Sequence, residues 1–261
     1  MQCVMFYVAL MQPSPMDDRD PFTDRFEPDS QPTPFAEAAP DARALDAARA
    51  TSVQVGGGSG VIVSRDDDAY YVLTNAHVVG FFNREEELVM PDGAELVGEV
   101  VKRNNPIGSA SDLAVVKVEA PGKHYGVASW GDDEPALSST AVQAGFPKND
   151  PAGSNTLADH GRGLQYVTGT VSEDLQRADG TGQRLSGSYE IGLSADLTMG
   201  SSGGGTFDSE GRLIGINGRG VTGRQQVPAQ DGSNLPLDPD TKALIIDVPA
   251  AREFIKDVVP E

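Results

Sequence analysis

The stretch Gly200-Ser201-Ser202-Gly203-Gly204-Gly205 lies between two apolar segments with the character of β-strands. These are Tyr189-Glu190-Ile191-Gly192-Leu193 upstream and Gly211-Arg212-Leu213-Ile214-Gly215-Ile216-Asn217 downstream. Glycine tolerates positive φ and puts no Cβ between the backbone and an approaching substrate. A serine on such a turn can present its hydroxyl beside converging backbone N–H groups, as a nucleophile with an oxyanion hole requires. Taken alone, the stretch is also typical of a Gly/Ser hairpin loop.

Two further segments favour the chemical interpretation. Tyr71-Val72-Leu73-Thr74-Asn75-Ala76-His77-Val78-Val79 is a hydrophobic run that carries one histidine. Ser111-Asp112-Leu113-Ala114-Val115-Val116-Lys117-Val118 is a β-branched run that opens with one aspartate. Singly, such a histidine is typical of a core residue and such an aspartate of a turn. Together with Ser202 they supply His, Asp and Ser in one of the known chain orders of the hydrolytic triad.

On these motifs the sequence resembles the chymotrypsin-like serine peptidases, most closely their bacterial HtrA/Deg-type branch. The matching pieces are Thr74-Asn75-Ala76-His77-Val78-Val79, Ser111-Asp112-Leu113-Ala114-Val115 and Gly200-x-Ser202-Gly203-Gly204. The resemblance spans roughly residues 50–255. It implies an all-β fold of two six-stranded antiparallel β-barrels, a chymotrypsin-like double barrel, with a short helix at each end.

The composition fits this fold and excludes some partners. With 30 Gly, 18 Pro and 6% aromatic residues among 261, the chain favours short strands and frequent turns over long helices. The net charge of −19, without a visible Lys/Arg patch, argues against nucleic acid. An acidic surface would attract cationic peptides and repel acidic ones, although it also serves solubility. Cys3 is the only cysteine, which excludes an intramolecular disulfide.

Residues 1–40 are predicted to be a leader outside the domain. Residues 12–40 are rich in Pro, Asp and Glu, a composition typical of flexible segments. The apolar stretch from Cys3 to Met11 is too short to span a bilayer and lacks the basic flank of a secretory signal. It is consistent with the remnant of a signal or anchor. Because the resembling peptidases are mostly exported, we expect a periplasmic or extracellular location, with a cytoplasmic one left open.

The peptidase domain is expected at residues 41–255. A helix over Asp41–Arg49, with Asp41 as its N-cap, precedes the first barrel, and Ala250–Ile255 forms a closing helix. The first barrel, about residues 50–122, is predicted to contain Ser52–Val55, Val61–Val63, Tyr70–Leu73, Glu87–Met90, Glu95–Lys102 and Leu113–Glu119. The second, about residues 126–248, is predicted to contain Thr140–Ala144, Leu164–Glu173, Tyr189–Leu193, Thr206–Phe207, Leu213–Ile216 and Ala243–Ile246.

Other motifs support no cofactor or metal. Gly56–Gly60 is followed by a strand and by no Gly-Lys-Ser/Thr, so a phosphate-binding loop is disfavoured. Arg65–Asp68 lacks the spaced ligands of a calcium loop and is predicted to be a hairpin turn. Three long polar loops, Lys148–Gly163, Asp174–Gly187 and Arg224–Asp240, are predicted to frame a substrate cleft. After the closing helix we expect no room in this sequence for the PDZ domain that many HtrA/Deg-type peptidases carry.

The resemblance assigns roles residue by residue. Ser202 would attack the scissile carbonyl, His77 would transfer the proton, and Asp112 would orient His77. The oxyanion would rest on the backbone N–H groups of Gly200 and Ser202. The adjacent Ser201 is out of register with the family motif. His124 and His160 are alternative bases on composition alone, but their polar Gly/Lys- and Gly/Arg-containing surroundings indicate exposed loops.

Two departures from related motifs have consequences. Zymogen-activated relatives place an Asp at the position of Ser201, so we expect a domain that is competent without processing. Gly205 stands where the common motif has Pro. Glycine loosens the loop there, because Pro fixes φ and Gly does not.

Specificity has two competing interpretations. Asp196 lies six residues before Ser202, where trypsin-like members carry the acid that binds a basic substrate side chain. Alternatively, Asp196 only turns the chain. By the family register, Gly218, Arg219 and Gly220 belong to the strand that pairs with the substrate backbone, and Arg219 there would favour an acidic residue instead.

The sequence therefore predicts a serine endopeptidase that hydrolyses unfolded or extended protein segments through an acyl-enzyme. The alternative is a non-catalytic peptide-binding or chaperone-like module on the same fold. A third class, an esterase with the same triad, is left open, although an α/β-hydrolase is disfavoured because strands and long helices do not alternate around Ser202. The resemblance makes a trimer one option for assembly, but Phe22, Phe26 and Phe35 in the leader do not establish it.

Overall fold

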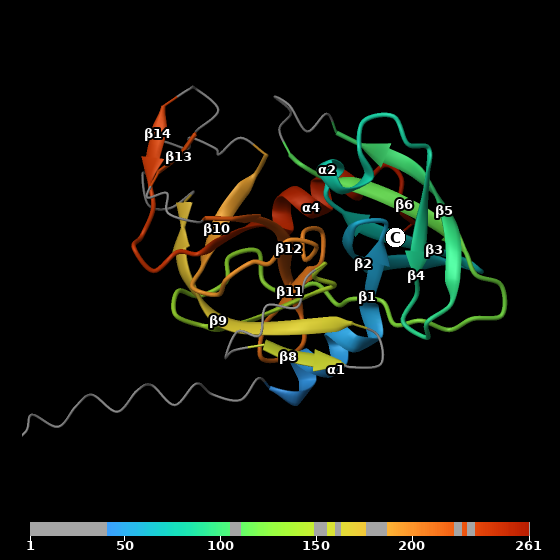
Figure 1. The fold of residues 1–261 in the computed structure, drawn as a ribbon, viewed down its shortest axis with the longest axis horizontal. Helices are drawn as coiled ribbons and strands as arrows, with labels where there is room; N and C mark the ends of the chain where they lie inside the picture. Colours follow the sequence, from blue (N-terminus) through green and yellow to red (C-terminus); the bar gives the residue numbers. More distant parts are fainter. Residues whose placement is uncertain are drawn as a thin grey trace, which may run out of the picture. The chain divides into compact units, whose positions relative to one another are not determined.

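Most of the strands form two sheets, and in each of these two sheets six strands return on themselves (Figure 1). A computed structural model describes residues 41–104, 111–148, 156–159, 163–175, 187–221, 226–228 and 233–260. All of these belong to one compact unit, Pro40–Glu261. No helix within the described ranges is long and apolar enough to cross a membrane.

The first sheet is a closed barrel with the strand order β1-β2-β3-β6-β5-β4. Its strands are β1 (Ser52–Val55), β2 (Gly58–Asp66), β3 (Ala69–Thr74), β4 (Glu85–Val89), β5 (Glu95–Arg103) and β6 (Ala114–Glu119). All of its neighbouring strands run antiparallel. The predicted first barrel is confirmed, with β2 extending beyond the predicted Val61–Val63 at both ends.

The second sheet has the order β10-β15-β12-β11-β7-β9-β8, and β10 also pairs with β9. Its strands are β7 (Thr140–Gly145), β8 (Thr156–Asp159), β9 (Leu164–Asp174), β10 (Tyr189–Leu193), β11 (Gly205–Phe207), β12 (Leu213–Gly220) and β15 (Ala243–Asp247). Six strands thus form the predicted ring, and β8 is a seventh strand that pairs with the beginning of β9. A separate hairpin joins β13 (Gln226–Pro228) to β14 (Asn234–Pro236).

The barrels share a core because several strands are apolar on both faces. In β3, Tyr70 and Val72 face the interior of the first barrel, whereas Tyr71 and Leu73 join a cluster that includes Val142 and Phe207 of the second sheet. Successive strand residues point to opposite faces, so a continuous apolar run is buried on both. The uninterrupted runs in the sequence therefore mark the strands that lie between the two barrels.

Three helices complete the described fold. The N-terminal helix α1 (Ala42–Thr51) begins as predicted at Asp41, whose Oδ1 accepts a hydrogen bond from the Arg43 N–H at 2.9 Å. The C-terminal helix α4 (Val248–Ile255) is capped in the same way by Asp247. The one-turn helix α2 (Ala76–Val79) was not predicted.

Some of the predictions concern residues that the structure does not describe, and one prediction about the loops is corrected. The leader, His160 and most of the three predicted loops lie outside the described residues. The loop prediction was wrong where β8, β13 and β14 occur. These strands are three or four residues long and lack a clear apolar alternation, so no pattern in the sequence predicts them.

Candidate active site

The histidine of the apolar run lies on α2, the single helical turn that follows β3. The turn is tied to the segment before β6: the Ala76 N–H and the Asn75 side-chain amide both donate to the Asp112 carbonyl, at 3.2 and 3.0 Å. It ends at Gly80, whose φ of +68° is available to glycine at little cost. The His77 side chain is 42% exposed, so one part of the ring faces solvent.

Asp112 holds this histidine through both of its carboxylate oxygens. His77 Nδ1 lies 2.6 Å from Asp112 Oδ2, and the His77 N–H donates to Oδ1 at 3.0 Å. The Tyr189 hydroxyl also donates to Oδ2. Burial raises the pKa of Asp112, but the hydrogen bonds and charge of His77 and the Tyr189 hydroxyl outweigh it, so its pKa lies below the ordinary 3.8. The carboxylate is therefore ionised at neutral pH.

Ser202 follows a tight turn whose geometry requires glycine. The Ser201 N–H donates to the Thr198 carbonyl at 3.0 Å, and Gly200 has φ +100°, which together describe a type II turn. The Met199 carbonyl accepts from the Lys148 N–H at 3.0 Å. Because N–H and C=O of a trans peptide point in opposite directions, the Gly200 N–H is directed away from Lys148.

The turn leaves two backbone donors free. Among the described residues, neither the Gly200 N–H nor the Ser202 N–H has an acceptor. Buried backbone N–H groups are rarely left unpaired, and two neighbouring ones suit an oxyanion. These are the two donors that the resemblance assigns to this role.

The serine segment packs against the end of β3, next to the histidine turn. A Cβ on Gly203 would lie 2.3 Å from Thr74 Oγ1 and 3.1 Å from the Asn75 nitrogen. Gly203 also has φ +85°, so both space and backbone conformation demand glycine here. On the other side, a Cβ on Gly58 would lie 2.8 Å from Val78 and 3.1 Å from the Ser202 carbonyl oxygen. The structure therefore brings the three predicted motifs together.

The Ser202 hydroxyl points to β12 in this conformation. Its Oγ donates to the Gly218 carbonyl at 3.3 Å, and the described residues contain no hydrogen bond between Ser202 and His77. Catalytic hydrogen bonds are often absent or long without substrate.

The two candidate specificity residues differ in placement. The Asp196 side chain is 81% exposed, with Oδ2 3.7 Å from Lys242 Nζ, so it lacks the burial that a basic-pocket carboxylate requires. Arg219 is exposed and forms no ion pair with any described residue. Between Asn217 and Arg219 the pairing of β12 with β15 shifts, which places Gly218 in an irregularity beside Ser202.

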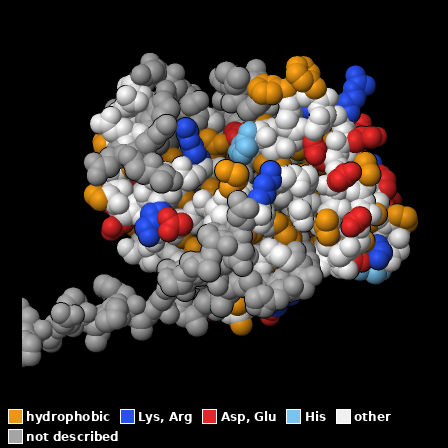
Figure 2. Space-filling view, viewed as in Figure 1, with side chains coloured by type: hydrophobic (Ala, Val, Ile, Leu, Met, Phe, Trp, Pro, Cys, Tyr) orange, Lys and Arg blue, Asp and Glu red, His pale blue; other side chains and the backbone are white. Residues whose placement is uncertain are grey.

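The charged side chains are unevenly distributed over the face of the molecule drawn in Figure 2. Figure 2 shows Lys and Arg side chains near a histidine in the middle of the face, whereas most of the acidic side chains visible there lie over the first barrel. The other described candidate base, His124, is exposed in the loop after β6.

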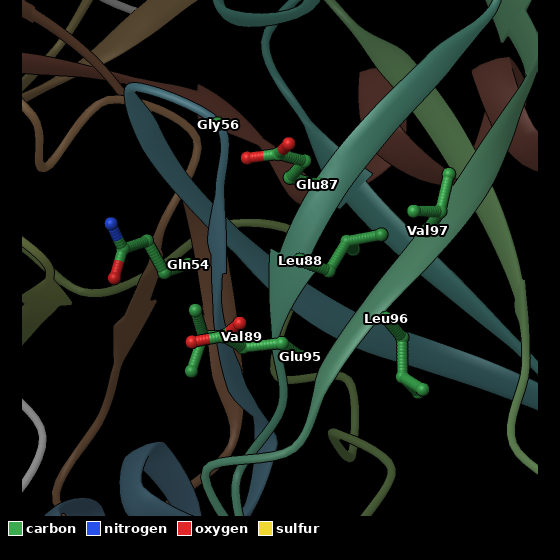
Figure 3. Close-up of a pocket in the computed structure, with 8 residues that line it drawn as sticks. All are labelled: Gln54, Gly56, Glu87, Leu88, Val89, Glu95, Leu96 and Val97. Carbon is green, nitrogen blue, oxygen red and sulfur yellow. The ribbon is translucent and has the colours of Figure 1, made fainter.

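A depression of about 450 Å³ lies elsewhere, on the outer side of β1, β4 and β5 (Figure 3). Its lining includes the carboxylates of Glu87 and Glu95 and none of His77, Asp112 and Ser202. The described part of the chain contains no cluster of three or more His, Cys, Asp or Glu side chains suited to a metal ion.

Sequence reasoning missed two polar residues of this site. Tyr189 donates to Asp112, and Ser59, at 0% exposure, donates through its hydroxyl to the Gly200 carbonyl at 2.8 Å. Their partners lie 77 and 141 residues away in the sequence. No local spacing connects such pairs.

Comparison with known proteins agrees with this geometry. The sequence pattern described as "Trypsin-like peptidase domain" matches residues 58–216. The chain is 32% identical over 162 residues to "Probable periplasmic serine endoprotease DegP-like" of Brucella suis, covering 61% of this chain and 27% of that protein. It is 29% identical over 162 residues to "Serine protease HtrA-like" of Staphylococcus epidermidis, covering 61% of this chain and 26% of that protein. The chain thus spans about a quarter of the length of these relatives.

Solved structures show the same fold. "HtrA-type protease AlgW with tripeptide" matches with a TM-score of 0.60 at 22% identity, over 84% of this chain and 63% of that one. "HtrA-type protease AlgW with decapeptide" matches with a TM-score of 0.54 at 23% identity, over 77% of this chain and 50% of that one. The match of residues 58–216 to the trypsin-like peptidase domain shows that this chain belongs to that family, with HtrA- and DegP-like proteins among its relatives.

Proposed function

We propose that the protein is a serine endopeptidase that uses Ser202, His77 and Asp112. The observation that carries the proposal is the 2.6 Å contact between the half-exposed His77 ring and the buried Asp112 carboxylate. The adjacent serine turn holds two N–H groups that have no acceptor among the described residues. A histidine held in this way keeps its other ring nitrogen available for a nearby hydroxyl.

The reaction follows from these positions. Ser202 Oγ turns from Gly218 to His77 Nε2, gives up its proton and forms a bond to the scissile carbonyl carbon. The negative charge that develops on the carbonyl oxygen is met by the N–H groups of Gly200 and Ser202, each worth about 3–4 kcal/mol in comparable sites. His77 then gives the proton to the leaving amine. A water molecule hydrolyses the acyl-enzyme by the same route.

Extended protein segments are the proposed substrates. The end of β12, Gly218–Gly220, lies beside Ser202 and would pair with the substrate backbone. The peptide complexes of the HtrA-type protease AlgW support a peptide ligand. Of the two specificity interpretations, we favour an acidic preference through Arg219, which forms no ion pair with a described residue, over a basic one through the exposed Asp196. Relatives named as periplasmic support export as part of the proposal.

Labelling with a fluorophosphonate probe tests the nucleophile. We expect the wild-type protein to be labelled, Ser202→Ala and His77→Ala to be unlabelled, and Ser201→Ala, the matched neighbouring serine, to be labelled as the wild type is. A folded wild-type protein that neither reacts with the probe nor cleaves an unfolded protein would contradict the proposal. It would favour the non-catalytic peptide-binding alternative, for which the Ser202–Gly218 hydrogen bond is the supporting observation.

Matched peptides test the charge preference. Peptides that differ only in Asp, Asn or Arg near the cleaved bond should be cut with the highest kcat/KM when Asp is present. Arg219→Gln should remove the difference between Asp and Asn, and Asp196→Asn should leave it unchanged. A preference for Arg that disappears in Asp196→Asn would reverse the assignment.

A further inference from the structure

Tyr189, the first residue of β10, contacts the same carboxylate oxygen as the histidine. Its hydroxyl donates to Asp112 Oδ2, and His77 Nδ1 lies 2.6 Å from this atom. Tyr189 and Asp112 are only 8% and 5% exposed, so water does not substitute readily for either partner. Asp112 is thus held from two sides, by α2 and by β10.

Two glycines leave the space that the Tyr189 ring occupies. A Cβ on Gly218 would lie 2.1 Å from Tyr189 Cε1, and a Cβ on Gly187 would lie 2.7 Å from Tyr189 Cε2. Both glycines contact the site through their carbonyl groups: Gly187 accepts from the Asp112 N–H at 3.1 Å, and Gly218 accepts from Ser202 Oγ. Any larger residue at either position would therefore displace the ring from Asp112.

The surrounding charges keep the tyrosine a hydrogen-bond donor. Burial raises the pKa of Tyr189, and the charge of Asp112 and the hydrogen bond to it raise the pKa further, while the charge of Arg219 lowers it. The ionisable groups that face one another here are His77, Asp112, Tyr189 and Arg219. With its proton retained, Tyr189 stabilises the charged form of Asp112.

We propose that Tyr189 is a positioning residue that holds the Asp112 carboxylate in the orientation in which it receives His77. The proposal rests on the proposed function and adds a residue to it. A donor to Asp112 also weakens the attraction between this carboxylate and a protonated His77. Removal of the Tyr189 hydroxyl should therefore raise the pKa of His77, since the carboxylate becomes a stronger partner for the imidazolium.

Tyr189→Phe removes the hydroxyl and keeps the ring. We expect kcat to fall about tenfold or more with KM nearly unchanged, because a hydrogen bond to a charged group is lost where the charge of His77 develops. The acid limb of the kcat/KM profile should move to higher pH by about half a unit. Nitrogen-15 NMR titration of the histidine side chains, with His77→Ala to assign the signal, should show the same shift of the His77 pKa.

Tyr70→Phe is the matched control. Tyr70 is also buried, and its hydroxyl donates to the Lys123 carbonyl at 2.9 Å in the first barrel. This variant should lose stability without shifting the pKa of His77. If Tyr189 had only a structural role, Tyr189→Phe would likewise lose stability without shifting the pKa of His77. That result would overturn the proposal.

Gly218→Ala provides an independent test that keeps the hydroxyl. The added methyl group should push the ring off Asp112 and shift the pKa of His77 in the same direction, and Tyr189→Phe should add little in the double variant. An additive second shift would contradict the proposal. Because the NMR titration needs no turnover, it decides the role of Tyr189 even if the wild-type protein fails the labelling test of the proposed function.

Discussion

At the scale of single residues, Ser59 joins three parts of the site. Its hydroxyl accepts from the Phe146 N–H and donates to the Gly200 carbonyl, both at 2.8 Å. Its N–H donates to the Ser202 carbonyl at 2.9 Å, and its carbonyl accepts from Thr74 Oγ1 at 2.6 Å. The orientation of the Gly200–Ser201 peptide, at the centre of the oxyanion turn, therefore depends on one buried hydroxyl.

We predict that Ser59→Ala lowers kcat about tenfold and leaves KM nearly unchanged. Direct loss of an oxyanion donor costs about 10²–10³ in kcat, and a loosened turn should cost less. The free energy of unfolding should fall by about 1–3 kcal/mol, since two buried backbone groups lose their partner. Steady-state kinetics and urea unfolding measure both effects. Ser64→Ala, on the same strand with a hydroxyl bonded to the Pro260 carbonyl, should keep kcat, and an equal loss there would contradict the assignment.

The residues of the site differ in how far the sequence reveals them. His77 interrupts an apolar run, Asp112 opens one, and Ser202 stands among glycines, so each is conspicuous in its own segment. Ser59 also stands among glycines, but the segment predicts only a hairpin, because the partner of its hydroxyl is 141 residues away. Asp196 is conspicuous only through its register, which matches a family position, and the exposure of its side chain could not be read from the sequence.

At the scale of elements, the interiors of the strands follow from the sequence and their ends do not. Continuous apolar runs such as Tyr70–Leu73 require burial on both faces and so predict strands between the barrels. Pairing continues past these runs through polar residues, as at Ser64–Asp66 of β2, which pair with residues 69–71 of β3. The turn α2 has four residues and depends on bonds to the distant Asp112, so no helical periodicity reveals it.

A carboxylate in the β4–β5 turn links this hairpin to the loop after β6. Asp92 lies 2.7 Å from Lys123 Nζ and accepts from the Tyr125 hydroxyl and the Ala94 N–H, both at 3.0 Å. The pKa of Asp92 is lowered to about 2, mainly by the hydrogen bond from Lys123. Burial opposes this shift with a smaller effect. A carboxylate with a lowered pKa stabilises the fold above its ordinary pKa, and this contribution is lost as the pH falls toward the lowered value.

We predict that Asp92→Asn destabilises the protein at pH 7 by less than about 1 kcal/mol, because the ion pair is exposed to solvent. The difference from the wild type should persist down to about pH 4 and disappear toward pH 2. Urea unfolding of both proteins across this range measures it. Asp68→Asn is the control, because the Asp68 carboxylate accepts from the Gly122 N–H of the same loop at 3.4 Å and forms no ion pair with a described residue. A difference that grew as the pH fell would contradict the assignment.

At the scale of the whole molecule, α1 belongs to the core that joins the barrels. Ala44 and Ala48 are fully buried in the same cluster as Leu73 of the first barrel and Phe207 of the second. Gly211 lies directly against α1, since a Cβ there would lie 2.7 Å from the Arg43 carbonyl oxygen. The helix thus supports the sheet that carries the serine turn, and the described packing begins at the N-cap, Asp41.

We predict that a protein beginning at Asp41 keeps the melting temperature and the probe labelling of the full chain, because every described contact of the fold is retained. A protein beginning at Ser52 lacks α1 and should lose roughly 2–4 kcal/mol of unfolding free energy, since its buried alanines and their apolar neighbours are removed. Calorimetry and fluorophosphonate labelling of the three proteins measure both properties. If the protein beginning at Asp41 were labelled much faster than the full chain, the first forty residues would restrain the site, contrary to a domain that is competent without processing. If it were labelled much more slowly, those residues would contribute to the site directly.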